Sequence, residues 1–71
     1  MNKFSPAKLQ NSKWTAVNPV RKEKHWLVTE LVRDADDNIT ECVIEAVYSK
    51  REKYIDWREL RDPENWLQGW K

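Results

Sequence analysis

Hydrophobic and polar residues alternate most clearly in the middle of the chain, over residues 39–48. Cys42, Ile44, Ala46 and Tyr48 share one parity in this stretch, and charged residues and valines take the other. A period of two residues is typical of a strand that turns one face toward a core. We therefore predict a strand over residues 39–48 whose apolar face carries these four side chains.

A second strand is predicted over residues 25–32, where aromatic, leucine and β-branched residues dominate. Residues 34–38 between the two strands are almost entirely Asp and Asn. Asp37 or Asn38 can adopt the left-handed backbone conformation that a tight turn needs, without glycine. The two strands are therefore expected to form a hairpin.

The length of the hairpin loop decides which side chains of the 25–32 strand reach the core. A loop of about five residues turns Trp26 and Val28 inward, whereas a loop of about four residues turns Leu27 and Leu31 inward, because a one-residue shift exchanges the two faces. The sequence leaves both registers open.

Shorter elements are predicted on either side of the hairpin. Residues 13–17 are rich in strand formers and stop at Asn18-Pro19, and residues 53–55 predict another short strand. The Ser5-Pro6 pair breaks regular structure near the N-terminus, so residues 1–11 are expected to form a flexible arm.

Two helix-start signals follow the last predicted strand. Asp56 and Glu59 have the spacing of a capping box. Asp62-Pro63 combines a cap residue with proline at the first helical position, and Gly69 stands where a helix C-terminus favours glycine. We therefore expect two short helical turns, or one broken helix, at the C-terminus.

Together these elements predict a mainly β fold. We expect a small antiparallel meander of about four strands, curled toward an SH3-like half-barrel and closed by short C-terminal helical turns. Residues 12–71 would form this single tryptophan-rich β domain, preceded by the arm of residues 1–11.

Composition explains what holds so small a core together. The chain has 71 residues and one cysteine, Cys42, so no disulfide can form within it. His25 is the only histidine and there is no cysteine pair, so a structural metal lacks its usual ligands. Dense aromatic packing remains, and the five tryptophans are expected to supply the core. No cofactor or metal is expected.

Targeting signals are not apparent in the sequence. The first 13 residues are polar and basic, without the apolar segment of a secretory signal, and no apolar run approaches the length of a membrane span. With its single cysteine, the chain is expected to be a cytoplasmic protein, a monomer without membrane association.

Charge is unevenly distributed although the net charge is only +1. Residues 1–33 carry seven Lys and Arg against two Glu, whereas residues 34–49 carry five acidic residues and no basic one. This asymmetry favours either a basic surface for an anionic partner or the neutralisation of neighbouring strands of opposite sign.

Basic residues interleaved with aromatic ones are the most suggestive feature of the sequence. Single-stranded nucleic acid binds to such surfaces through backbone charge and base stacking. The candidate nucleic-acid-binding residues are Lys13, Arg21, Lys22, Lys24, Trp26, Lys50, Arg51 and Lys53. Glu23 and Glu52 interrupt the two basic clusters, and a solvated strand edge with solubilising lysines would explain the same residues.

The C-terminal tryptophans support a competing hypothesis. If Trp70 is not buried, an exposed aromatic ring at this position would mark a protein-binding patch, with Trp66 and Trp70 as its candidate residues. If both rings instead cover the core, they serve only packing.

The sequence contains no recognisable set of catalytic residues. A single glycine, Gly69, excludes phosphate-binding glycine loops. Cys42 lies among apolar residues in a predicted strand, where a buried thiol is inert, so a catalytic pair with His25 is not expected. Residues 34–45 resemble a calcium loop only in their acids, because Ile39 stands where that loop requires glycine.

The chain resembles the tryptophan-rich family of small conserved hypothetical proteins of bacteria, over roughly residues 9–71. The segments that carry the resemblance are Ser12–Pro19, Lys22–Trp26, Glu45–Arg51 and Trp57–Leu60, with Trp66, Gly69 and Trp70. The resemblance implies a stand-alone domain and brings no established activity or site. The expected role is a non-enzymatic cytoplasmic interaction module, whose partner is nucleic acid or another protein.

Overall fold

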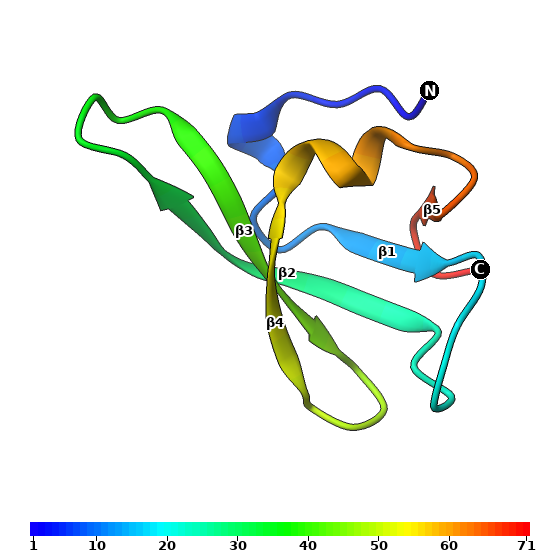
Figure 1. Cartoon of the computed structure of the whole chain (residues 1–71). Coiled ribbons are helices and arrows are strands. Elements are labelled where there is room, and N and C mark those ends of the chain that lie inside the picture. Colours follow the sequence, from blue (N-terminus) through cyan, green and yellow to red (C-terminus); the bar gives the residue numbers. More distant parts are fainter.

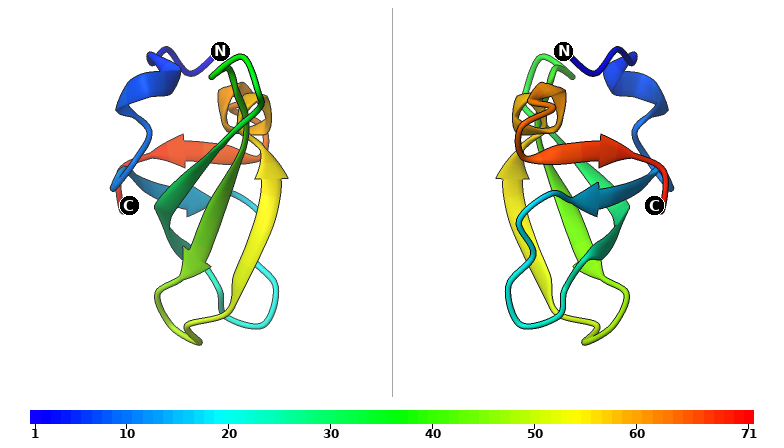
Figure 2. Two further views of the ribbon diagram at one scale, coloured as in Figure 1. Left: turned by 90° about the vertical axis from the view of Figure 1, so that its left-hand side faces the viewer. Right: turned by 90° about the vertical axis from the view of Figure 1, so that its right-hand side faces the viewer.

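A computed structural model describes all residues, 1–71. Five antiparallel strands form one sheet: β1 (Lys13–Ala16), β2 (His25–Arg33), β3 (Ile39–Ala46), β4 (Glu52–Asp56) and β5 (Trp66–Gln68). Their order in the sheet is β4-β3-β2-β1-β5. Two short 3₁₀ turns accompany them, η1 (Pro6–Lys8) and η2 (Trp57–Arg61). The sheet curls strongly, so that η2 and β5 lie across its concave side (Figures 1 and 2), in agreement with the predicted curled meander.

The β2–β3 hairpin is confirmed, and a bulge combines the two registers that the sequence left open. Residues 34–38 form the turn, and Asp37 adopts the left-handed conformation with φ 65°. Trp26 and Val28 face the core opposite Ala46 and Ile44. The register then shifts between Val28 and Glu30, so that Leu31 also packs against the core from the same strand.

The core is built from ten buried side chains, among them three tryptophans: Leu9, Trp14, Trp26, Val28, Cys42, Ile44, Ala46, Ile55, Leu60 and Trp66. Three of the five tryptophans expected to supply the core lie in it, Trp57 packs against it partly buried, and Trp70 is 43% exposed. Tyr48 was expected on the core face but is 70% exposed, because β3 ends at Ala46 and residues 47–49 form a turn.

The capping box at Asp56 is confirmed. The Asp56 side chain accepts from the Arg58 backbone N–H at 2.9 Å, and the Glu59 side chain accepts from the Asp56 N–H at 3.2 Å. This arrangement starts η2, whose Leu60 is fully buried.

The second predicted helical turn is wrong, and a fifth strand takes its place in the mainly β fold. The Asp62 carboxylate accepts hydrogen bonds from the Glu64 N–H and the Asn65 side chain, which makes a turn rather than a helix. The chain then enters β5, which pairs with β1, and Gly69 has φ 81° just beyond that strand. Pairing with a distant strand outweighs the local helix signal.

Residues 1–11, expected to be a flexible arm, pack against the domain in the structure. Leu9 is 1% exposed, and Phe4 makes edge contacts with Trp14 and Trp57. The Asn2 side chain donates to the carbonyl of Leu60 at 2.9 Å and to that of Trp66 at 2.8 Å. The segment covers the end of the fold that holds η2 (Figure 1).

Candidate functional site

Two loops meet at the end of the molecule opposite η1. The β1–β2 loop, residues 17–24, and the β3–β4 turn, residues 47–51, lie side by side in all views (Figures 1 and 2). The Val47 N–H donates to the His25 carbonyl at 2.9 Å where the two segments begin to part. Residues that are far apart in the sequence therefore form one surface.

Glu23 and Arg51 fasten these loops together. The Arg51 guanidinium donates to both carboxylate oxygens of Glu23, with Nε at 3.0 Å and Nη2 at 2.5 Å, and the Ser49 hydroxyl donates to the same carboxylate. These hydrogen bonds, from Arg51 first and then Ser49, lower the pKa of Glu23 to about 2. Glu23 is only 2% exposed, so the ion pair with Arg51 neutralises its charge inside the fold and not at the surface.

Three basic residues of the two loops have left-handed backbone conformations. The φ angles are 54° for Arg21, 64° for Lys22 and 64° for Lys50. Residues other than glycine adopt this region at a cost, and such positions persist where the surrounding structure enforces them. Here the enforcing contacts are the Glu23 N–H bond to Val20 and the Lys50 N–H bond to Ala46. All three side chains are exposed.

Exposed cations and an exposed aromatic ring gather on this end. We name the loop-end surface the set Arg21, Lys22, Lys24, Tyr48 and Lys50. The three ion pairs of the structure involve Arg33, Arg51 and Arg58, so the four cations of the loop-end surface have no carboxylate within ion-pair distance. Tyr48 is 70% exposed. The surface can therefore offer positive charge and one stacking face at the same place.

Three of the predicted nucleic-acid-binding residues lie elsewhere. Lys13 is on β1, where its ammonium lies 4.7 Å from the Trp70 ring centroid. Lys53 projects from β4 into the concave side, 5.1 Å from the Trp26 ring centroid. Trp26 itself is buried, because its ring packs between Lys53 and Trp66. Arg51, another of the predicted residues, lies in the β3–β4 turn, where its ion pair with Glu23 holds the two loops together.

The two C-terminal tryptophans differ in exposure. Trp66 is buried in the core against Trp26, whereas Trp70 is 43% exposed. The Trp70 indole N–H donates to the Trp26 carbonyl at 3.0 Å, and its ring lies 5.9 Å from that of His25. Trp70 therefore meets the exposure condition set for a protein-binding patch, whereas Trp66 belongs to the core.

Cys42 and His25 are far apart on the sheet. Cys42 pairs with Leu31 on β2, and His25 lies six residues further along that strand, about 20 Å away at ~3.3 Å per residue. Burial raises the pKa of the Cys42 thiol to about 12, with smaller contributions from Glu59 and Asp56. The thiol is thus neutral and remote from the histidine.

Four acidic residues of β3 and β4 lie on the convex face of the sheet, opposite the core. Cross-strand pairing places Glu41 opposite Asp56 and Glu45 opposite Glu52. Like charges directly opposite each other destabilise a sheet, so the charge asymmetry of the sequence is not neutralised between strands. The sequence placed Glu41 and Glu45 on the face away from the core, but the acids opposite them follow only from the β3–β4 register.

The cations of the loop-end surface and the acidic residues of the convex face therefore lie on different parts of the molecule. No helix of the structure has the length and apolar character needed to cross a bilayer.

Comparison with known proteins identifies one family. The model of a family described as "Tryptophan-rich protein (DUF2389)" matches residues 12–71. No curated protein and no solved structure gives a significant match. The match spans the whole β domain, and the chain belongs to this tryptophan-rich protein family, a family of unknown function.

Proposed function

We propose that the protein is a non-enzymatic module that binds single-stranded nucleic acid through the loop-end surface. The observation that carries the proposal is that four cations without ion-pair partners and the exposed ring of Tyr48 belong to two loops that lie side by side at one end of the molecule. Cations bind the phosphate backbone, and an exposed aromatic ring stacks on a base without regard to its identity.

The charge distribution supports the same partner. Glu23, which interrupts the basic cluster in the sequence, is buried and paired with Arg51, so it does not repel phosphate at the surface. The acidic convex face repels a polyanion and so favours its approach to the loop end. The proposal includes a cytoplasmic location and a monomeric protein, for which light scattering would give a mass near 8.6 kDa.

Fluorescence anisotropy with a labelled single-stranded 12-mer of mixed sequence tests the proposal, at several salt concentrations between 25 and 200 mM. About four phosphate contacts predict a slope of log affinity against log salt near −3, at about 0.7 per contact. Changing Lys22 or Lys50 to Gln should make the slope shallower by about 0.7. Tyr48→Ala should weaken binding about 5- to 150-fold, the equivalent of roughly 1–3 kcal/mol.

Lys8→Gln is the matched control, since it removes the same charge from η1 at the opposite end of the molecule. It should leave the slope unchanged. Absence of binding at the lowest salt, or an equal effect of Lys8→Gln and Lys22→Gln, would contradict the proposal.

A further inference from the structure

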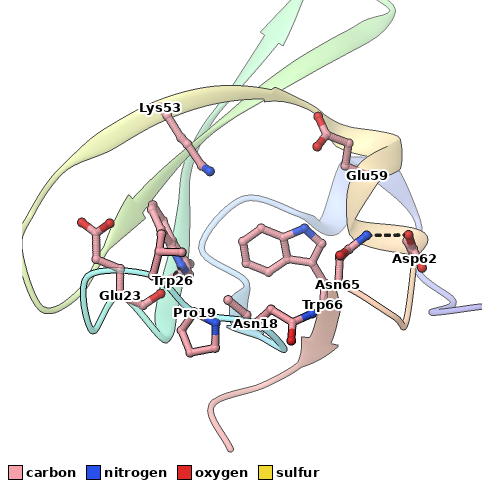
Figure 3. Close-up of a pocket in the computed structure, with 11 residues that line it drawn as sticks. Asn18, Pro19, Glu23, Trp26, Lys53, Glu59, Asp62, Asn65 and Trp66 are labelled. Carbon is pink, nitrogen blue, oxygen red and sulfur yellow. Dashed lines mark hydrogen bonds between the residues drawn. The ribbon is translucent and has the colours of Figure 1, made fainter.

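A cavity opens on the concave side, next to the loop-end surface (Figure 3). Its volume is about 390 Å³, within the range of small-molecule sites. The β1–β2 loop forms one wall, and β4, η2, the turn after η2 and the start of β5 form the others. The wall that contributes Asn18, Pro19 and Val20 continues directly into Arg21 and Lys22.

Two indole rings form the apolar part of this cavity. Trp26 and Trp66 meet edge to face, with centroids 6.2 Å apart and planes at 82°. The Trp26 N–H donates to the Glu23 carbonyl at 2.8 Å. No protein acceptor bonds the Trp66 N–H, so a ligand can accept from it.

A cation and two acceptors face the same space. The Lys53 ammonium forms no ion pair and points into the cavity from β4 (Figure 3). Glu59 approaches from η2 and uses one carboxylate oxygen for the capping box, which leaves the other free. Asn65 donates its amide to Asp62 at 2.7 Å, which leaves its carbonyl oxygen free.

These groups fit a neutral planar ligand that both donates and accepts hydrogen bonds. We propose that the cavity binds one base of the nucleic-acid strand, with Lys53 donating to a base carbonyl and Glu59 accepting from an exocyclic amino group. Cytosine and guanine carry both groups, whereas thymine has no amino group. Glu59 and Asp62 would repel a phosphate from this space, and the phosphates instead meet Arg21 and Lys22.

The inference rests on the proposed function and deepens it, because it adds base selection to a surface that otherwise binds phosphates and stacks on a base of any identity. Single-stranded nucleic acid allows such selection, since an unstacked base can turn out of the strand into a pocket.

The test compares three strands of the same length: oligo-dC, oligo-dT and a strand of abasic sites, at one salt concentration. Oligo-dC should bind at least about 5-fold more tightly than oligo-dT, as one good side-chain contact to a base discriminates by about 5- to 150-fold. In NMR titrations the indole N–H signal of Trp66 should shift with oligo-dC and stay in place with the abasic strand.

Two variants assign the discrimination to the cavity. Glu59→Gln keeps the capping contact, because Gln serves in a capping box, and should reduce the preference for oligo-dC toward unity. Lys53→Gln should weaken oligo-dC binding more than binding of the abasic strand. The matched controls Glu64→Gln and Lys8→Gln change the same charges outside the cavity lining and should preserve the preference.

The outcomes separate the two proposals. Equal affinity for oligo-dC and oligo-dT, with an unmoved Trp66 signal, would overturn the base site and leave the loop-end surface, whose cations and Tyr48 do not distinguish one base from another. Absence of binding to every strand would overturn both. A Trp66 shift with a peptide but with none of the strands would assign the cavity to a protein partner instead.

Discussion

Single side-chain contacts determine which charges the two basic loops expose to solvent. In the sequence, Glu23 is an acid inside a basic run; in the fold, Arg51 and Ser49 bind its carboxylate below the surface. The four remaining cations of the loops therefore act without an opposing charge. The burial of Glu23 depends on a residue 28 positions away, which no local pattern reveals.

Acid should destabilise the fold through the Glu23 carboxylate. Its folded-state pKa, about 2, lies below the ordinary 4.5, so its contribution to stability is complete above pH 4.5 and is lost as the pH falls toward 2. Thermal melts between pH 7 and pH 2 should show a decreasing midpoint over this window. Arg51→Gln should lower the midpoint at neutral pH and make the decrease shallower.

Asp56 contributes to the same window, since hydrogen bonds from Arg58 lower its pKa to about 2. Part of the acid dependence should therefore survive in Arg51→Gln and become smaller when Arg58→Gln is added, because only the backbone N–H of residue 58 then still donates to Asp56. An unchanged pH profile in Arg51→Gln would contradict the role assigned to Glu23.

The Cys42 thiol should be inert in the folded protein. It is fully buried and its pKa is raised to about 12, so almost no thiolate exists at neutral pH. A maleimide reagent at pH 7.5 should label the native protein at least about 100-fold more slowly than the protein in denaturant. Comparable labelling rates would mean that β3 opens readily.

At the scale of the elements, local signals predicted the β2–β3 hairpin and the capping box, whose contacts lie within a few residues. They failed at β5. Asp62-Pro63 and Gly69 resemble the two ends of a helix, yet residues 66–68 pair with β1 about 50 positions away. Of the candidate site, the sequence identified the cations. It could not show that Trp26 is buried or that Tyr48 is exposed, because both depend on where strands end and pair.

The cap of η2 should contribute measurably to stability. Asp56→Ala removes the acceptor of the Arg58 N–H and should cost about 1 kcal/mol in the free energy of unfolding, within the usual ~0.5–2 kcal/mol for caps. Urea denaturation measures the effect. Asp36→Ala, at an exposed turn position whose carboxylate accepts no hydrogen bond within the protein, is the control and should change stability by less than about 0.5 kcal/mol. Equal losses in both variants would contradict the capping role.

At the scale of the whole molecule, the fold has two ends with different tasks. The loop end carries the cations of the loop-end surface, and the cavity lies next to it on the concave side. The other end is closed by residues 1–11, where Asn2 joins η2 to β5 and Phe4 packs on Trp14 and Trp57. A domain this small buries a modest fraction of its surface, so each such contact carries a large share of its stability.

The N-terminal segment should therefore be part of the stable domain, although the family model begins at residue 12. Leu9→Ala should lower the free energy of unfolding by about 2–5 kcal/mol, because Leu9 is fully buried in the core. Lys8→Ala, at the exposed neighbouring position, should change it by less than about 0.5 kcal/mol.

Deletion of residues 1–11 removes Leu9 together with Phe4 and the Asn2 bridge, so the loss should exceed that of Leu9→Ala. With about 5 kcal/mol available to a marginal domain, residues 12–71 alone should be largely unfolded or strongly destabilised in urea titrations. If they unfold at the same urea concentration as the whole chain, the segment packs on a core that does not need it. The loop end should then still bind nucleic acid in the shortened protein, since none of its residues contacts the segment.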